Sequence, residues 1–421
     1  MVKPGDKLNQ MGKLLSAKFG NVKNKGNMFG LFLIAILLCG VGYQVYSIMK
    51  LANPKKSNPK TNGIDLNFIQ PKVISITPDD KDFQQPLYDY YIKAAYNCCA
   101  VDQFANSVVN ENALKNVIKN GARFLDFEIY SVDGYKPVIG ISTSDNNNYK
   151  ENNNENYYLG DALEFVNKHA FITGTNGCKN PNDPIFLHLR IKSDHKDLYN
   201  NVAKAITSNF DIDQQLLGKD FSYAFNGYNL GKIPLNTLCA GGKFPQNSKT
   251  AKMNRKAKVV VIVQTDNKDY LSSSLGELVN IESGSNFINL KESFSIKTEQ
   301  NKKAVIEHNK HNITIVTPDK IPKGGDANSL ECCVPGSQNP NFKNSFGIGC
   351  QIVCMCFQNS DTNLINYNKF FDSKGTAFVL KPQALRYKIV CIDPPKPQKK
   401  ENSFAQRKVA VGGGVPVELK L

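Results

Sequence analysis

The sequence predicts an α/β protein built around a closed (β/α)8 barrel of the TIM type. Two observations lead to this fold class. Short apolar runs rich in β-branched residues alternate with amphipathic helical segments, and the alternation continues over most of the chain. Strands that alternate with helices form a parallel sheet. One such barrel commonly takes about 250 residues, so a closed barrel accounts for the length most economically.

The predicted elements follow one another from residue 86 onward. The first apolar run ends at Tyr96, and apolar residues at helical spacing follow over 110–120. Gly121 is then well suited to end that helix. The second apolar run ends at Tyr130. Further strands are predicted at 184–191, 259–264 and 312–316, and further helices at 159–170, 198–210 and 302–308.

Polar residues stand at the ends of the first two predicted strands. Asn97 follows the first strand, and Asp126 and Glu128 lie two residues apart in the second. In a strand, this spacing places both carboxylates on one face. Oxygen ligands that converge at the ends of neighbouring parallel strands suit a hard cation such as calcium. The alternative is that both acids are ordinary solvated strand residues.

Two long strings near the end of the alternating region are the most specific in the chain. They read GIGCQIVCMCFQ at 347–358 and GTAFVLKPQALR at 375–386. Together with the runs at 86–99 and 120–128, they resemble the X and Y regions of phosphoinositide-specific phospholipase C, in a divergent form. The resemblance implies a phosphodiesterase barrel made of an X-like half at 85–264, a short linker at 265–291 and a Y-like half at 292–393.

The resemblance also implies where the catalytic residues would stand. The family cleaves a phosphodiester with a pair of His residues and a calcium ion. Tyr96 stands at the first His position, and the segment 137–145, where the second is expected, contains no His. A phenol, whose pKa is about 10, is a poor proton donor and acceptor near neutral pH. Both imidazoles are therefore missing from their family positions.

The family's calcium ligands fall on Asn97, Asp126 and Glu128, with the acidic pair in reversed order, and the fourth falls on Arg190. A guanidinium there would repel a divalent cation. Calcium is thus the cofactor that the resemblance implies, and we expect it to have been lost. We expect Arg190 to pair with Asp126 or Glu128 instead. His188, on the same strand face, either points into this site or is a packed or solvated residue.

The substrate-binding positions of the Y-like half fall on Ser293 and Lys320. With both His residues and one acidic ligand replaced, the sequence predicts a catalytically degenerate phospholipase C-like protein. Its barrel would bind a phosphoinositide or have a structural role. The alternative is a divergent, active phosphoric diester hydrolase that acts on phosphatidylinositol lipids.

The N-terminal region predicts membrane attachment. Residues 1–27 form a basic tail, and the uncharged, apolar segment 28–49 is long enough for a transmembrane helix. A cleaved signal peptide is the alternative. We expect a signal anchor in a single-pass membrane protein, with the N-terminus in the cytoplasm. The Pro- and Lys-containing segment 50–84 reads as a linker, and residues 394–421 read as a disordered tail.

The net charge limits the expected binding partners, and the cysteine content raises the question of disulfides. The formal net charge is +15, but the basic residues are spread over the chain, so we expect no nucleic-acid partner. The membrane and an anionic phospholipid headgroup are the expected partners. The eleven cysteines include the adjacent pair Cys98 and Cys99. They are either buried free thiols or disulfide partners beyond the signal anchor.

Overall fold

The computed structural model describes residues 71–101, 108–141, 156–175, 177–244, 254–319 and 339–387, and two strands at 407–411 and 415–419. The predicted transmembrane segment 28–49 lies outside the described residues, as does Lys320. Among the helices that are described, none has the length and apolar character needed to cross a membrane.

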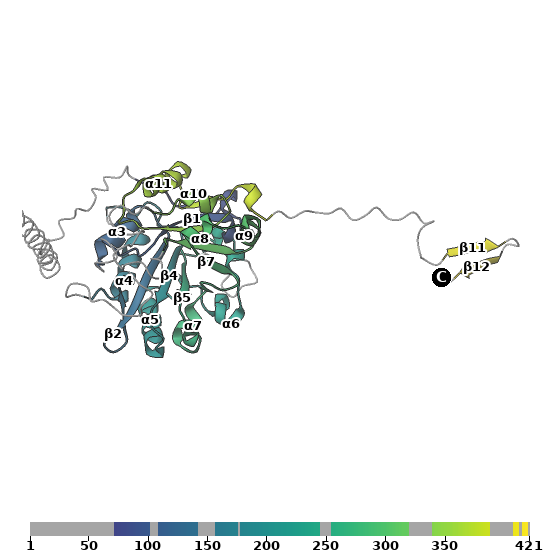
Figure 1. The fold of residues 1–421 in the computed structure, drawn as a ribbon. Helices are drawn as coiled ribbons and strands as arrows, with labels where there is room; N and C mark the ends of the chain where they lie inside the picture. Colours follow the sequence, from purple (N-terminus) through teal and green to yellow (C-terminus); the bar gives the residue numbers. More distant parts are fainter. Residues whose placement is uncertain are drawn as a thin grey trace, which may run out of the picture. The chain divides into compact units, whose positions relative to one another are not determined.

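Eight parallel strands form a nearly closed barrel, which confirms the core of the predicted fold class (Figure 1). With one exception, each barrel strand pairs with the next barrel strand along the chain, and the last pairs with the first. The strand pairing leaves one gap, because β6 and β7 do not pair. The barrel strands are β1 (Tyr90–Ala95), β2 (Phe124–Val132), β4 (Ile185–Ile191), β5 (Val259–Gln264), β6 (Ile281–Glu282), β7 (Ile288–Glu292), β8 (Ile313–Thr317) and β9 (Ile352–Met355).

Two further strands extend the sheet in the antiparallel sense: β3 (Lys136–Ile139) pairs with β2, and β10 (Phe378–Leu380) pairs with β1. Helices lie around the barrel (Figure 1). They are α3 (Glu111–Lys119), α4 (Leu159–Ala170), α5 (Lys196–Asn209), α6 (Tyr223–Asn226), α7 (Ser274–Leu278), α8 (Ser293–Lys297), α9 (Lys302–Asn309), α10 (Phe342–Phe346) and α11 (Thr362–Lys374).

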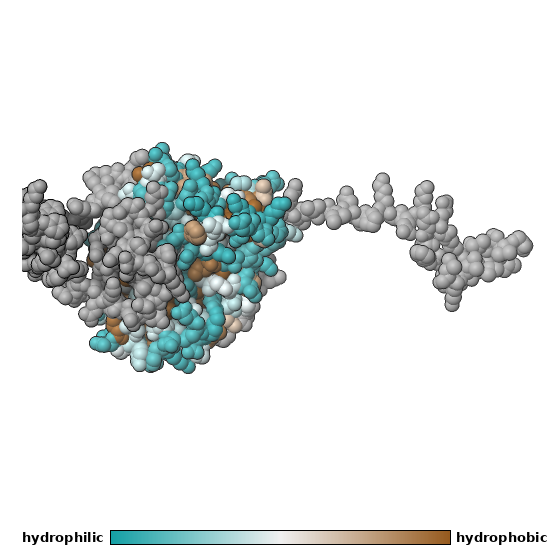
Figure 2. All heavy atoms as spheres, viewed as in Figure 1, coloured by the Kyte–Doolittle hydropathy of each residue, from teal (hydrophilic) through white to brown (hydrophobic). Residues whose placement is uncertain are grey.

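Local sequence explains where these elements form. The strands β1 and β4 are buried along their whole length, as expected for parallel strands that are covered on both faces. The side chain of Asn110 caps α3 by accepting a hydrogen bond from the backbone N–H of Ala113. Gly375 ends α11 with a φ of 71°, a left-handed conformation that favours glycine. The outer face of the barrel in Figure 2 is mainly hydrophilic, with scattered apolar residues.

Three predicted segments differ from the structure. The described part of the predicted linker, residues 71–84, packs on the barrel with Val73 and Ile76 buried, and 73–77 forms no strand. The predicted X/Y linker 265–291 contains α7, β6 and most of β7. The tail predicted as disordered contains a hairpin of β11 (Arg407–Val411) and β12 (Val415–Leu419). In each segment, the local composition did not indicate the structure that forms.

The described cysteines are free thiols. All seven are buried, including Cys98 and Cys99, so the disulfide that the sequence left open does not form there. Burial raises the pKa of the Cys98, Cys239 and Cys354 thiols well above the usual value. Because the thiolate is the reactive form, we interpret these three residues as core residues.

Candidate functional site

The candidate site lies at the mouth of the barrel, which we define as the carboxyl-terminal ends of the barrel strands. In the register of β2 and β4, Asp126 stands beside His188 and Glu128 beside Arg190. Asn97 follows the end of β1, the other neighbour of β2. Parallel pairing therefore brings the residues that the sequence singled out to one place. In enzymes with this barrel, the active site lies at the same end.

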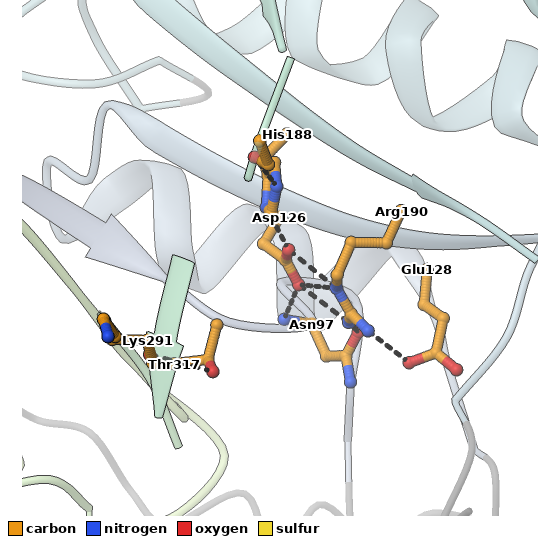
Figure 3. Close-up of polar contacts among 8 residues, drawn as sticks. Asn97, Asp126, Glu128, His188, Arg190, Lys291 and Thr317 are labelled. Atoms are coloured by element: carbon orange, nitrogen blue, oxygen red, sulfur yellow. Dashed lines mark hydrogen bonds and ion pairs between the residues drawn. The ribbon is translucent and has the colours of Figure 1, made fainter. Parts of the chain in front are cut away.

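Arg190 is the centre of a buried network with Asn97, Asp126 and Glu128, which we call the Arg190 network (Figure 3). Its Nε donates to Asp126 Oδ2 at 2.9 Å, and its Nη2 donates to Asp126 Oδ1 at 2.9 Å. Its Nη1 donates to Glu128 Oε2 at 2.9 Å, and Nη2 also donates to Asn97 Oδ1 at 2.5 Å. The expected pairing of Arg190 with Asp126 or Glu128 is confirmed, and it involves both carboxylates.

The backbone at the end of β1 holds this network in place. Asn97 has a φ of 42°, a left-handed conformation that asparagine tolerates better than most residues. Its backbone N–H donates to Asp126 Oδ1 at 2.9 Å. The ring of Tyr96 lies 4.5 Å from the Arg190 guanidinium carbon, a distance suited to a cation–π contact. Tyr96 therefore packs on the arginine at the end of β1.

Electrostatics keep the central pair charged. Burial by itself raises the pKa of Asp126, but the Arg190 charge and the hydrogen bond from His188 outweigh it and hold that pKa well below its usual range. Burial by itself lowers the pKa of Arg190, because it disfavours the charged form here too. Asp126, Tyr96 and Glu128 outweigh it and raise that pKa well above its usual value. The hydroxyl of Tyr130 also donates to Glu128. A fixed internal cation thus offsets the negative charge of the mouth.

The residues present do not fit a calcium ion. The oxygens of Asn97, Asp126 and Glu128 that would coordinate it accept hydrogen bonds from Arg190 instead. No group of three or more His, Cys, Asp or Glu residues in the described parts of the chain could hold a metal ion. Asn97, Asp126 and Glu128 also line a small adjoining hollow.

His188 points into the site, which settles a question that the sequence left open. Its Nδ1 lies 2.7 Å from Asp126 Oδ2, and its Nε2 lies 2.8 Å from Ser283 Oγ. Ser283 follows β6 directly and was not predicted as a site residue. Strand β6 has two residues and falls inside the predicted linker, so its sequence carries no strand signal that could have revealed this contact.

Of the two predicted substrate-binding residues of the Y-like half, Lys320 lies outside the described residues, and no contact among the described residues joins Ser293 to the Arg190 network. Ser293 begins α8 directly after β7 and is partly exposed. Asp319, next to the undescribed Lys320, accepts a hydrogen bond from the backbone N–H of Phe294 at 2.5 Å. Figure 3 shows Lys291 and Thr317, from β7 and β8, apart from the network.

Among the comparisons with known proteins, only the search of solved structures found similar chains. No protein-family model matches the chain, and no curated protein matches it. Among solved structures, it is similar to PLC21 from L. pealei, with 13% identity and a TM-score of 0.47, and to PLC21 from S. officinalis, with 15% identity and a TM-score of 0.48. Each alignment covers 72% of this chain and 38% of the other chain.

The alignment with a bacterial protein covers nearly the whole length of that protein. It is the calcium-dependent phosphoinositol-specific phospholipase C from Pseudomonas sp., with 12% identity, a TM-score of 0.39, and coverage of 74% of this chain and 99% of that chain.

Proposed function

We propose that this chain is a membrane-anchored, phospholipase C-like barrel protein that has lost calcium-dependent phosphodiester cleavage and binds a phosphoinositide headgroup at its mouth. The observation that carries the loss of activity is the Arg190 guanidinium, which is bonded at once to Asn97, Asp126 and Glu128. An arginine cannot be deprotonated in a protein, so its positive charge opposes a metal ion at the same oxygens.

Tyr96 supports the same proposal. Its hydroxyl stands where a proton donor and acceptor would be needed, and its ring packs on the Arg190 guanidinium. General acid and base groups work best when their pKa lies near the working pH, which an unperturbed phenol does not meet. Replacement of one catalytic side chain would slow the reaction. Replacement of both a His and a metal ligand removes the proton-transfer group and the metal site together.

Two features support membrane anchoring and a headgroup ligand. The apolar segment 28–49 has the length of a bilayer span, and the net charge of +15 favours anionic partners. If the barrel no longer binds a headgroup, its remaining role is structural.

Activity and binding can be tested on the same preparation of the full-length chain in detergent. We expect no inositol phosphate release from phosphatidylinositol 4,5-bisphosphate in mixed micelles with millimolar calcium. We expect inositol 1,4,5-trisphosphate, and not inositol, to raise the thermal denaturation temperature, because a ligand that binds only the native state stabilises it. Alkaline carbonate extraction should leave the chain in the membrane pellet.

Each part of the proposal has its own contradicting result. Calcium-dependent release that disappears in the Asp126→Asn variant would overturn the loss of activity. Equal temperatures with and without inositol 1,4,5-trisphosphate would leave only the structural role. A soluble chain that begins near Leu51 would identify the apolar segment as a cleaved signal peptide.

A second candidate is an active, calcium-independent phosphoric diester hydrolase. The observation that favours it is His188, which brings an imidazole into contact with Asp126 at the mouth. Arg190 would then supply the positive charge that calcium supplies in the family. Release of inositol phosphate in the presence of a calcium chelator, lost in a His188→Gln variant, would support this candidate over the first.

A further inference from the structure

Three side chains from separate parts of the barrel form a continuous chain of hydrogen bonds. Asp126 lies in β2, His188 in β4, and Ser283 follows β6. The imidazole of His188 bridges the other two residues, with 2.7 Å from Nδ1 to Asp126 Oδ2 and 2.8 Å from Nε2 to Ser283 Oγ. Figure 3 shows His188 and Asp126 directed toward one another. We call these three residues the Ser283 relay.

The direction of each hydrogen bond follows from charge. The carboxylate of Asp126 is paired with the Arg190 guanidinium, and an ionised carboxylate only accepts hydrogen bonds, so it accepts one from His188 Nδ1. The Nδ1 atom therefore carries the hydrogen, and in the neutral imidazole Nε2 keeps its lone pair. That lone pair accepts from the hydroxyl of Ser283. This is the arrangement in which an imidazole can remove a proton from a serine.

Burial favours the same direction of chemistry. Asp126 and His188 are both 0% exposed, whereas Ser283 is 8% exposed and is the only member of the relay with any exposed surface. Ser283 is therefore the residue of the relay at which a reactant could approach. The backbone N–H of Ser283 donates to the carbonyl of Val263 at 2.8 Å, which fixes the serine beside β5. Beyond it lies the gap between β6 and β7.

We propose that Ser283 is a nucleophile that attacks carboxylic esters, with His188 as its general base and Asp126 as the residue that orients the imidazole. The Ser283 Oγ forms a bond to the carbonyl carbon, and its proton moves to His188 Nε2. The bond from that carbon to the alcohol oxygen then breaks, and the alcohol leaves with the proton from His188. Water, activated by the same imidazole, hydrolyses the acyl-serine and releases the acid.

This activity goes beyond the proposed function and does not depend on it. It uses neither calcium nor a phosphodiester, and Asp126 is the only residue that the relay shares with the Arg190 network. Loss of phospholipase C activity would leave the Ser283 relay intact. A barrel that failed to bind a phosphoinositide headgroup could still react at this serine.

A fluorophosphonate probe tests the nucleophile directly in the full-length chain with a calcium chelator present. The serine oxygen displaces fluoride from phosphorus, and the labelled residue is identified by peptide mass spectrometry. We expect labelling at Ser283, abolished in Ser283→Ala, and about 100-fold slower or more in His188→Gln, because general base catalysis contributes about that factor. The matched control is Ser272→Ala, which removes an exposed serine in the same region and should leave the labelling rate unchanged.

Hydrolysis of 4-nitrophenyl acetate gives the second readout. We expect an initial burst of about one equivalent of 4-nitrophenol, as an acyl-serine forms and then hydrolyses slowly. Labelling of other serines only, or no labelling of the folded chain, would overturn the proposal. So would an unchanged labelling rate in a folded His188→Gln variant. Peptide mapping of the unsubstituted chain keeps the test decisive even where a variant fails to fold.

Discussion

The pKa values of buried acids at the two ends of the barrel shift in opposite directions. At the mouth, the pKa of Asp126 lies well below its usual range. At the opposite end, which we call the floor, burial raises the pKa of both Asp89 and Asp183 to about 6. Burial is the largest cause at all three, so the difference lies in the partner. Asp126 accepts hydrogen bonds directly from a guanidinium, whereas Asp183 accepts its hydrogen bonds from the backbone N–H of Ile76 and from an amide.

The buried cations show the same contrast. Burial lowers the pKa of Lys93 and of Lys381 to about 8, and both side chains donate to backbone carbonyls at helix ends. Lys93 Nζ donates to Asn120 O at 2.6 Å, and Lys381 Nζ donates to Asn309 O at 2.7 Å. Arg190 at the mouth donates to carboxylates and keeps its charge. At the floor, burial thus shifts the pKa values of ionisable groups toward neutral pH, whereas at the mouth the charges compensate one another.

The largest expected effect comes from removing the cation of the mouth. Arg190→Met should destabilise the fold by about 3 to 5 kcal/mol, because it leaves two buried carboxylates without the positive charge that compensates them. Arg190→Lys should recover part of the loss, since an ammonium restores the charge but not the paired geometry. Urea denaturation of the variants measures both changes. A loss below about 1 kcal/mol for Arg190→Met would show that mouth and floor do not differ in this way.

The next large effect is expected when the charge at position 190 of the mouth is reversed. Arg190→Glu should create calcium affinity, since Asn97, Asp126, Glu128 and the new carboxylate would offer four oxygen-bearing groups. At a calcium concentration of about 100 times Kd, the native state would gain about 2.7 kcal/mol, visible as a higher denaturation temperature. Arg190→Gln is the control and should not respond. Stabilisation of the unsubstituted chain by millimolar calcium would contradict our interpretation of the mouth.

Much of this contrast could be predicted from the sequence, because spacing and alternation act locally. The period-two spacing of Asp126 and Glu128 placed both acids on one face, and parallel order brought Arg190 to them. The contact of His188 with Ser283 could not be predicted, because 95 residues separate them and β6 is only two residues long. The packed segment 71–84 and the hairpin of β11 and β12 were missed because their partners are not encoded in local composition.

Acid titration separates the two kinds of buried carboxyl group. Because the native state raises the pKa of Asp183 to about 6, its contribution to stability is fully present below about pH 4 and is lost as the pH rises through 6. Asp183→Asn should flatten that change, which is about 3 kcal/mol in size. Asp126 has the opposite sign, since its stabilisation is present above about pH 4 and lost below it. Denaturation of Asp183→Asn and Asp126→Asn across pH 3 to 7 should therefore give opposite differences from the unsubstituted chain.

The smallest expected effect belongs to the floor cation Lys93, which is fully buried and donates to the carbonyl of Asn120. At neutral pH, Lys93→Met should change stability by less than about 1 kcal/mol, because the lost hydrogen bond is offset by the charge that no longer needs burial. The native pKa of about 8 lies below the unfolded value of 10.5. The unfolded chain therefore binds more protons between these values, and the stability of the unsubstituted chain should rise with pH there.

Lys93→Met removes that rise. Its stability relative to the unsubstituted chain should therefore fall by about 1 to 2 kcal/mol between pH 8 and 9.5. Urea denaturation at both pH values measures the change, and Lys115→Met, at a partly exposed position in α3, is the control that should show no such trend. A difference that stays constant over this range would show that Lys93 is charged in the native state, as Arg190 is at the mouth. The two ends of the barrel would then treat their cations alike, and the contrast would rest on the carboxyl groups only.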